Sequence, residues 1–223
     1  MPAHPLPPVS HVVWDWNGTL LDDFELTARI AARTLATLGV PDVTGDDIRA
    51  HFQRPFSGFY ARLFGRPITP IELDYIRERY RVEYHAELHA LRLQQDAEEA
   101  LDLVEAHPAT QSLLSMAPDG QLQALVDEHG LRGRFVRVEG SPASDSDGIK
   151  AERLRAHLAE LEVHATSAVV IGDTVDDQEA ALAVGASSVL VTTGSSSRAS
   201  LEATGAPVVD TLLDAVRVAT KGR

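Results

Sequence analysis

Short apolar runs, each ended by a polar residue or a glycine, occur once near the start of the chain and repeatedly in its second half. Runs of this length bounded by turn residues are typical of buried strands. They alternate with segments in which apolar residues recur every three or four positions, as on one face of a helix. We predict strands at about His11–Asp15, Gln111–Ser115, Phe135–Glu139, Ser167–Ile171, Ser188–Val191 and Val208–Val209.

The segments between these strands have the apolar spacing of helices. Strands that alternate with helices indicate a parallel sheet covered on both faces, a doubly wound α/β fold. The predicted helices of this part are Ala97–Ala106, Asp119–His129, Ile149–Leu161, Asp176–Val184 and Thr211–Thr220.

The stretch from Phe24 to Leu93 has no strand signal and a helical pattern almost throughout. We therefore predict a discontinuous core domain, residues 1–22 and 95–223, with an all-helical cap domain, residues 23–94, inserted after the first strand. Within the cap, the aromatic stretch Phe52–Phe64 is expected to pack the cap rather than to line a substrate pocket. The Pro-rich residues 1–8 are expected to form a loose arm.

Composition excludes several classes of protein. The net charge of −13 argues against nucleic acid or an anionic membrane as a partner. No cysteine is present, so disulfides and thiolate metal sites are excluded. No apolar run approaches the length of a membrane span, and the start lacks a secretory signal pattern. We expect a cytoplasmic protein, a monomer or a homodimer, with no nucleic-acid or membrane partner.

Polar residues follow several of the predicted strands. Asp15, Ser115 and Asp173 come at strand ends, and Lys150 begins a helix after a loop. Because the carboxyl ends of parallel strands meet at one edge of a sheet, these side chains are expected to converge there. Two carboxylates suit Mg²⁺, while a hydroxyl and a lysine suit phosphate oxygens. Nearly all basic residues of the chain are arginines, which makes a lysine at position 150 notable.

Four separated motifs make the chain resemble the haloacid dehalogenase-like hydrolase superfamily, in its phosphoglycolate phosphatase-like branch. The first is Asp15-Trp16-Asn17-Gly18-Thr19-Leu20, close to DxDGT. Ser115 after an apolar strand and Lys150 match the second and third. The fourth, residues 172–177, reads GDTVDD and is close to GDxxxD. The helical insert matches the position of this family's cap.

The resemblance implies a Mg²⁺-dependent hydrolase acting on a small phosphorylated metabolite. It makes Asp15 the nucleophile that forms an aspartyl-phosphate. Mg²⁺ would be bound by the carboxylates of Asp15 and Asp173 and by the backbone carbonyl of Asn17. Asp177 would bind the metal directly or through water, with Asp176 as an alternative.

Phosphate recognition is assigned by the same resemblance to Ser115 and Lys150, which would hold the transferring phosphoryl group. From the cap, Arg54 is a candidate reader of a substrate carboxylate or phosphate. An ordinary surface arginine is the competing interpretation.

Asn17 departs from the family pattern. The family has a second acid here, which protonates the leaving alcohol and then activates water, and an amide does neither. Three interpretations stay open. The substrate has an acidic leaving group, as an acyl phosphate or phosphoanhydride does. Another group, such as Asp22, Asp23, His51 or Arg54, replaces the acid. Or the protein is catalytically weakened and only binds a phosphorylated metabolite. Phosphoryl transfer to an acceptor other than water is a further alternative function.

On sequence alone, Asp15→Asn is expected to abolish activity, whereas Asn17→Asp is expected to preserve or raise it, because a titrating proton returns to the site. Steady-state rates on phosphate esters with Mg²⁺ measure both. Loss of activity in Asn17→Asp would contradict the idea that Asn17 is merely a weakened acid.

Overall fold

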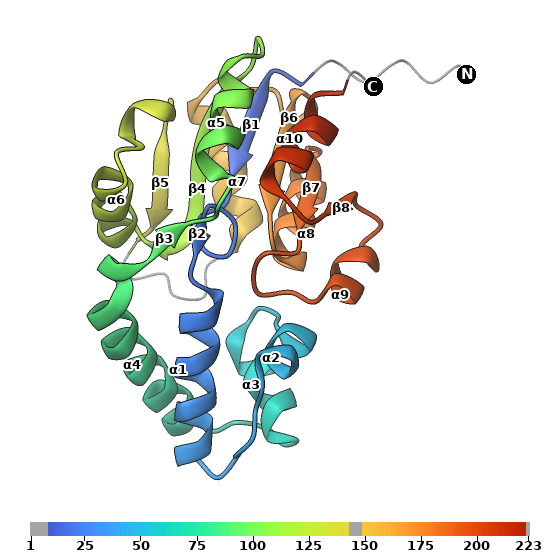
Figure 1. Cartoon of the computed structure of the whole chain (residues 1–223). Helices are drawn as coiled ribbons and strands as arrows, with labels where there is room; N and C mark the ends of the chain where they lie inside the picture. The colour runs from blue at the N-terminus through green and yellow to red at the C-terminus, as the bar shows by residue number, and fades with distance from the viewer. Residues whose placement is uncertain (1–8, 143–148, 222–223) are drawn as a thin grey trace.

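A six-stranded parallel sheet forms the centre of the structure, a computed structural model that describes residues 9–142 and 149–221 (Figure 1). Its strand order is β5-β4-β1-β6-β7-β8. The chain therefore runs outward from β1 in one direction and then returns to add β6 on the other side. The bounds are β1 His11–Trp14, β4 Thr110–Pro118, β5 Val138–Ser141, β6 Ala168–Gly172, β7 Ser187–Val191 and β8 Val208–Val209.

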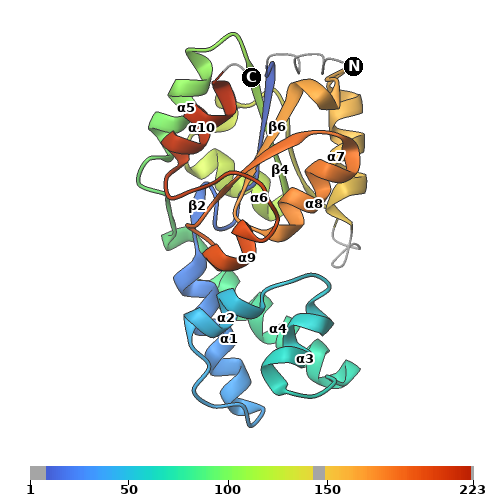
Figure 2. The ribbon, with the colours of Figure 1, turned by 90° about the vertical axis from the view of Figure 1, so that its right-hand side faces the viewer.

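Helices cover both faces of this sheet, as the alternating pattern predicted (Figure 2). α5 (Ala97–Glu105), α6 (Asp119–Glu128) and α10 (Leu212–Thr220) pack on one face. α7 (Lys150–Glu160) and α8 (Val175–Val184) pack on the other. The predicted fold class is confirmed. The short helix α9 (Arg198–Glu202) was not predicted, because its five residues are too few to show a period.

Strand β1 is buried on both faces, which explains its unbroken apolar sequence. Val12 and Trp14 point toward α5, α6 and α10, whereas Val13 points toward α7 and α8. Burying one such side chain stabilises the fold by about 1.5–3 kcal/mol. The strand therefore has a fixed register, and the residue that follows it, Asp15, has a fixed position.

Four helices lie beyond the carboxyl edge of the sheet and form the inserted segment (Figure 1). They are α1 (Phe24–Thr37), α2 (Gly45–His51), α3 (Phe56–Phe64) and α4 (Pro70–Glu87). Thr44 and Thr69 begin α2 and α4 with capping boxes. A separate apolar cluster holds these helices together and includes Phe59 and Tyr60, with Phe52, Phe56 and Phe64 packed against it. The prediction that the aromatic stretch packs the cap is confirmed.

Two very short strands connect this segment to the rest of the chain. β2 (Leu21–Asp22) and β3 (Arg92–Leu93) pair in antiparallel fashion, with Leu21 opposite Leu93. The expectation of no strand between Phe24 and Leu93 missed β3, and β2, which lies just before that stretch, was not predicted either. Two residues cannot show alternation. A 3₁₀ turn, Leu88–Ala90, separates α4 from β3. The domain boundaries at residues 22/23 and 94/95, which fall beside this pair, stay a prediction.

Two predicted strands differ in extent from the observed ones. β4 continues past Ser115 to Pro118, so Ser115 does not end its strand. β5 is Val138–Ser141 rather than Phe135–Glu139, because a 3₁₀ turn over Arg132–Arg134 delays it. The predicted arm, residues 1–8, lies outside the described residues. None of the helices within 9–142 and 149–221 is long and apolar enough to cross a membrane.

A buried polar chain crosses β1, β4, β5 and α7. His11 contacts the hydroxyls of Thr110, at 2.6 Å, and Ser112, at 2.8 Å. His157 contacts the same Ser112 hydroxyl at 2.8 Å and Glu139 at 2.9 Å. Burial, followed by the charge of His157, lowers the pKa of His11 to about 4.

Replacing His11 by Gln is expected to change the acid stability of the fold. The folded pKa of His11 lies below the unfolded value of 6.5, so the unfolded chain takes up the proton first as the pH falls. The stability contributed by neutral His11 is complete above pH 6.5 and is lost toward pH 4, a change of about 3 kcal/mol. Urea unfolding of wild type and His11→Gln across this range measures the difference. The exposed His107→Gln is the control, and a pH-independent difference for His11→Gln would contradict the prediction.

Candidate active site

Asp15 lies directly after β1, where the strand order reverses. Its backbone N–H donates to the carbonyl of Ile171 at 2.9 Å, which fixes the residue against β6. The residue is 7% exposed, and its side chain accepts a hydrogen bond from Lys150 Nζ at 2.6 Å. Ligands of open α/β sheets bind at such a switch point. The predicted nucleophile is therefore in the expected place and is almost fully buried.

Lys150 is the first residue of α7 and lies between two carboxylates. It forms ion pairs with Asp15 and with Asp177. Burial alone would lower the pKa of Lys150, but the charges of Asp15 and Asp177 outweigh burial and raise it. The charged ammonium form of Lys150 is therefore favoured within a buried site.

Asp173 and Asp177 come from the end of β6 and the first turn of α8. Asp173 accepts hydrogen bonds from the Thr19 hydroxyl, at 3.0 Å, and from the Ser195 backbone N–H, at 2.6 Å. One oxygen of Asp177 accepts from the N–H and hydroxyl of Thr174, at 3.0 and 2.6 Å, in the capping box of α8. Its other oxygen faces Lys150. Helix capping thus holds Asp177 in one orientation.

Two glycines make room for the Asp173 carboxylate. A Cβ atom at Gly18 would lie 2.6 Å from Asp173 Oδ2, and one at Gly194 would lie 2.0 Å from it. Gly18 also has a φ of +71°, which favours glycine. The glycine of the first motif is therefore required by contact as well as by the turn.

The three carboxylates of Asp15, Asp173 and Asp177 form a cluster that fits a metal ion. One oxygen from each lies within 4.8 Å of the others. Carboxylate oxygens are the ligands that Mg²⁺ prefers. Burial raises the pKa of Asp15 to about 6, and Asp177 adds to the rise while Lys150 opposes it. Burial and the charges of Asp15 and Asp177 also raise the pKa of Asp173.

Charge counting leads to the same conclusion. One ammonium against three carboxylates leaves two formal negative charges uncompensated in a buried place. Buried charge is costly unless it is paired, and a divalent cation would balance it. The donor set therefore suits a hard divalent cation.

Ser115 lies on the neighbouring strand, β4. The register that pairs Trp14 with Leu113 places Ser115 near the same edge as Asp15. Its buried hydroxyl accepts a hydrogen bond from the Ala117 backbone N–H at 3.1 Å. The hydroxyl proton is left to donate to a ligand, and Ser115 keeps its predicted place despite the longer strand.

Two arginines of the inserted segment contact the core. Arg54 Nε lies 3.6 Å from Asp176 Oδ2, in the first turn of α8 next to Asp177. Arg49 donates to the carbonyl of Gly194 at 2.9 Å, and its guanidinium lies 3.6 Å from the centre of the Phe24 ring. The sequence indicated Arg54 but gave no signal for Arg49, because its partner is a backbone oxygen 145 residues away.

The side chain of Asn17 bonds to two residues outside the carboxylate cluster. Its amide nitrogen donates to Asp23 at 2.7 Å and to the Tyr84 hydroxyl at 2.9 Å. No hydrogen bond within residues 9–142 and 149–221 is made to its main-chain oxygen. That oxygen is the atom that the resemblance assigns to the metal. The sequence indicated Asp23 as a candidate replacement for the missing acid. It gave no indication that Tyr84 contacts Asn17.

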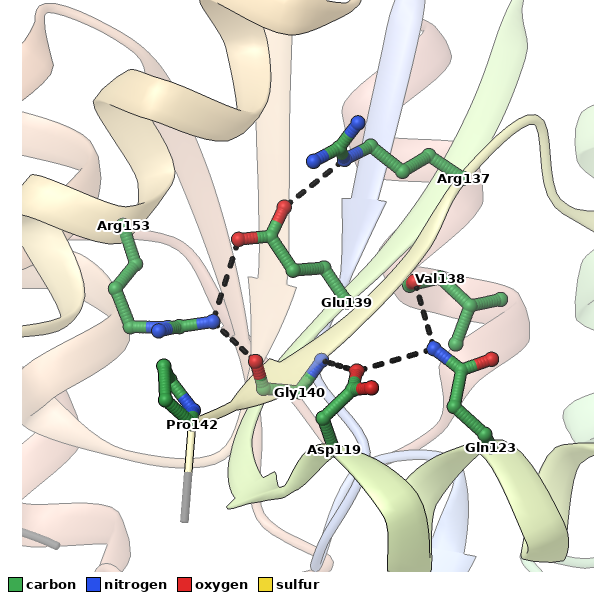
Figure 3. Close-up of a pocket in the computed structure, with 8 residues that line it drawn as sticks. All are labelled: Asp119, Gln123, Arg137, Val138, Glu139, Gly140, Pro142 and Arg153. Atoms are coloured by element: carbon green, nitrogen blue, oxygen red, sulfur yellow. Dashed lines mark hydrogen bonds and ion pairs between the residues drawn. The ribbon is translucent and has the colours of Figure 1, made fainter. Parts of the chain in front are cut away.

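An open pocket of about 570 Å³ lies elsewhere, along the edge strand β5 (Figure 3). Its polar groups are paired with one another. Glu139 accepts from Arg137 at 2.9 Å and Arg153 at 3.2 Å, and Asp119 accepts from the Gly140 N–H at 2.8 Å. None of the four motif residues Asp15, Ser115, Lys150 and Asp173 lines it. The chemistry is therefore expected at the carboxylate cluster and not in this pocket.

Comparison with known families identifies the class of protein. The pattern of the haloacid dehalogenase-like hydrolases matches residues 12–182, and a related HAD-hydrolase-like pattern matches residues 150–215. The chain belongs to the haloacid dehalogenase-like hydrolase family. Among curated proteins, no relative of the chain was found.

Several solved structures share this fold over nearly the whole chain. A predicted phosphatase from Clostridium acetobutylicum has a TM-score of 0.80 at 18% identity, covering 95% of this chain and 98% of that one. A predicted phosphoglycolate phosphatase from Haemophilus somnus has a TM-score of 0.73 at 16% identity, covering 94% and 97%. A HAD family hydrolase from Deinococcus radiodurans, with bound phosphate and sodium, has a TM-score of 0.68 at 20% identity, covering 93% of each. The resemblance to the phosphoglycolate phosphatase-like branch is confirmed at the level of the fold.

Mg²⁺ is expected to stabilise the wild-type protein through the carboxylate cluster. At a concentration ten times its dissociation constant, a bound ion stabilises by about 1.4 kcal/mol, which raises Tm by about 3 °C. Asp173→Asn should abolish this rise, because it removes one of the three carboxylates. Thermal unfolding with and without MgCl₂ measures the effect. Asp176→Asn, which removes the adjacent acid outside the cluster, should keep the rise, and an equal rise in Asp173→Asn would contradict the assignment.

Proposed function

We propose that the protein is a Mg²⁺-dependent phosphatase that hydrolyses a small phosphate monoester through an aspartyl-phosphate on Asp15. The observation that carries this proposal is the position of Asp15. It lies buried at the end of β1, with Lys150 on one oxygen and two more acids close by. Family membership supports the hydrolase class.

The proposed reaction has two steps at Asp15. A carboxylate oxygen of Asp15 attacks phosphorus, the bond from phosphorus to the ester oxygen breaks, and the leaving oxygen takes a proton from solvent, since the amide of Asn17 has none to give. Water then attacks the aspartyl-phosphate, which releases inorganic phosphate and returns the Asp15 carboxylate. The same residue thus begins and ends the cycle as a carboxylate.

Lys150 and Ser115 are proposed to hold the phosphoryl oxygens. The lysine is a compact point charge on a flexible stem, which suits a group whose geometry changes during transfer. The Ser115 hydroxyl, which already accepts from Ala117, has its proton available for a phosphoryl oxygen. The phosphate bound to the Deinococcus radiodurans structure supports an anion site in this fold.

Mg²⁺ is proposed as the cofactor, held by Asp15, Asp173, Asp177 and the main-chain oxygen of Asn17. When bound, it supplies positive charge next to the transferring phosphoryl group. The sodium ion in the Deinococcus radiodurans structure supports cation binding in this fold. Hydrogen bonds from Thr19 and the Ser195 N–H hold Asp173 in one orientation within the cluster, which supports this assignment.

Arg54 is proposed to read a second anionic group of the substrate. Its ion pair with Asp176 places the guanidinium beside the first turn of α8.

The inserted segment is proposed to act as a cap that limits water at the site during transfer. The partner is then a small phosphorylated metabolite. A cytoplasmic location and a monomeric or homodimeric state stay predictions from the sequence.

Asn17 favours one class of ester over another. Its amide cannot supply a proton to a leaving alcohol, and its side chain is already bonded to Asp23 and Tyr84. Esters with acidic leaving groups need no such proton. An acyl phosphate or phosphoanhydride is therefore the second candidate substrate class.

A substrate panel tests this proposal. With Mg²⁺, we expect acetyl phosphate and p-nitrophenyl phosphate to be hydrolysed faster than alkyl phosphates such as phosphoglycolate. The ratio of the two rates should exceed the ratio for an enzyme that has the acid by about 10²–10⁴-fold. Phosphate release at saturating substrate measures this ratio, and Asp15→Asn is the inactive control.

Two outcomes would redirect the proposal. Equal rates for aryl and alkyl esters would mean that another group supplies the proton. No turnover of any ester, together with a Mg²⁺-dependent rise in Tm on addition of one of them, would favour a binding protein over an enzyme.

A further inference from the structure

The side chain of Asn17 is the centre of a cluster of three hydrogen-bonded side chains. The amide nitrogen of Asn17 donates to Asp23 Oδ2 at 2.7 Å and to the Tyr84 hydroxyl at 2.9 Å. Tyr84 in turn donates to the same Asp23 oxygen at 2.8 Å. The other Asp23 oxygen accepts from the Gly18 backbone N–H at 2.8 Å. Each of the three side chains thus bonds to the other two, and Asp23 also bonds to the backbone of the loop.

These three residues come from three different parts of the chain. Asn17 lies in the loop that follows Asp15, Asp23 is the residue before α1, and Tyr84 is in the last turns of α4. The cluster therefore lies where the chain enters and leaves the inserted segment. Any rotation of the segment about β2 and β3 must change at least one of these distances.

Two of the three members, Asp23 and Tyr84, are buried, while Asn17 is half-buried. Asp23 and Tyr84 are each 3% exposed, and Tyr84 packs with the main apolar core rather than with the cluster inside the cap. Tyr80 stacks on Tyr84 at 5.2 Å between ring centres and contacts Thr27 of α1 at 3.2 Å. Buried polar groups of this kind are costly to leave unpaired, so the arrangement is strongly specified.

Charge explains why position 17 holds an amide here. An acid at position 17 in the same conformation would place a second carboxylate oxygen about 2.7 Å from Asp23 Oδ2, and like charges this close repel. The amide instead donates to Asp23, which receives hydrogen bonds on both oxygens. Asn17 and Asp23 thus form a matched pair of one amide and one carboxyl group.

We propose that Asn17 is a positioning residue whose amide, held by Asp23 and Tyr84, couples the loop carrying Asp15 to cap helix α4. The inference rests on the proposed function only for its kinetic consequence. The loop turns back on itself through Leu21 N–H to Trp16 O, at 2.8 Å, so a displacement at Asn17 is transmitted to both ends of the turn. Movement of the cap and orientation of the loop are then one event.

The first experiment measures the coupling without any substrate. Tyr84→Phe removes the hydroxyl that joins α4 to the loop but keeps the ring. Tyr80→Phe removes the neighbouring buried hydroxyl, which contacts only Thr27 among the hydrogen bonds above. We expect backbone amides of residues 16–21 to exchange with deuterium about tenfold faster in Tyr84→Phe, and within about twofold of wild type in Tyr80→Phe. Equal protection of this loop in the two variants would overturn the proposal.

The second experiment exchanges the members of the pair. Asn17→Asp sets two carboxylates against each other, and Asp23→Asn sets two amides against each other. Each is expected to lower Tm by about 5 °C. The double variant Asn17→Asp/Asp23→Asn restores a carboxylate–amide pair with reversed direction, and it should recover at least half of the combined loss. A loss in the double variant equal to that of the two single variants together would refute the matched pair.

Kinetics separates positioning from binding. If p-nitrophenyl phosphate is a substrate, Tyr84→Phe should lower kcat about tenfold with KM nearly unchanged, because a displaced loop misaligns Asp15 without removing a phosphate contact. Tyr80→Phe should leave both constants near those of wild type. A change confined to KM would contradict a positioning role. If the wild type turns over no ester, only the phosphatase proposal is refuted. The hydrogen-exchange and Tm measurements need no substrate and still test the coupling.

Discussion

The burial of one ammonium group among three carboxylates is the constraint on which the site depends. Lys150 contacts Asp15 and Asp177, and all three residues are buried. Charges in such a place must be paired, or the fold loses several kcal/mol. The neighbouring structure answers this need with hydrogen bonds to Asp173 and Asp177 and with glycines that leave space for them. The remaining negative charge is what makes the cluster suitable for a divalent cation.

The inserted segment is held to the core at two places of different character. On the open side, Arg49 and Arg54 reach Gly194 and Asp176, and both contacts are partly exposed. Where the segment joins the core, Asp23 and Tyr84 of the second contact are buried, and the half-buried Asn17 bonds to both. An ion pair that solvent reaches, such as Arg54 with Asp176, contributes about 0–1 kcal/mol, so it breaks easily. Buried contacts are costly to leave unmade. When the cap moves, the contacts of Arg49 and Arg54 are thus expected to open first, while the cluster of Asn17, Asp23 and Tyr84 stays formed.

Much of the architecture followed from local pattern. The apolar runs predicted the six strands of the sheet, because strands buried on both faces have continuous apolar sequences. The motif residues Asp15, Lys150 and Asp173 were found from their places after strands and before helices, and the structure brings them together. Elements of two to five residues, such as β2, β3 and α9, were missed because they are too short for any period. The end of β4 was misjudged because Ser115, although polar, continues the extended backbone toward Pro118.

By itself, the sequence determined the fold class, the order of the elements and the identity of the residues at the sheet edge. These depend on hydrophobic period and on residue type, which are local properties. Only the tertiary structure decided what each side chain meets. Asn17 appeared in the sequence as a lost acid, but its amide has Asp23 and Tyr84 as partners, the second of them 67 residues away. Contacts between distant residues leave no local pattern, so the physical reason for the amide is visible only when the chain is folded.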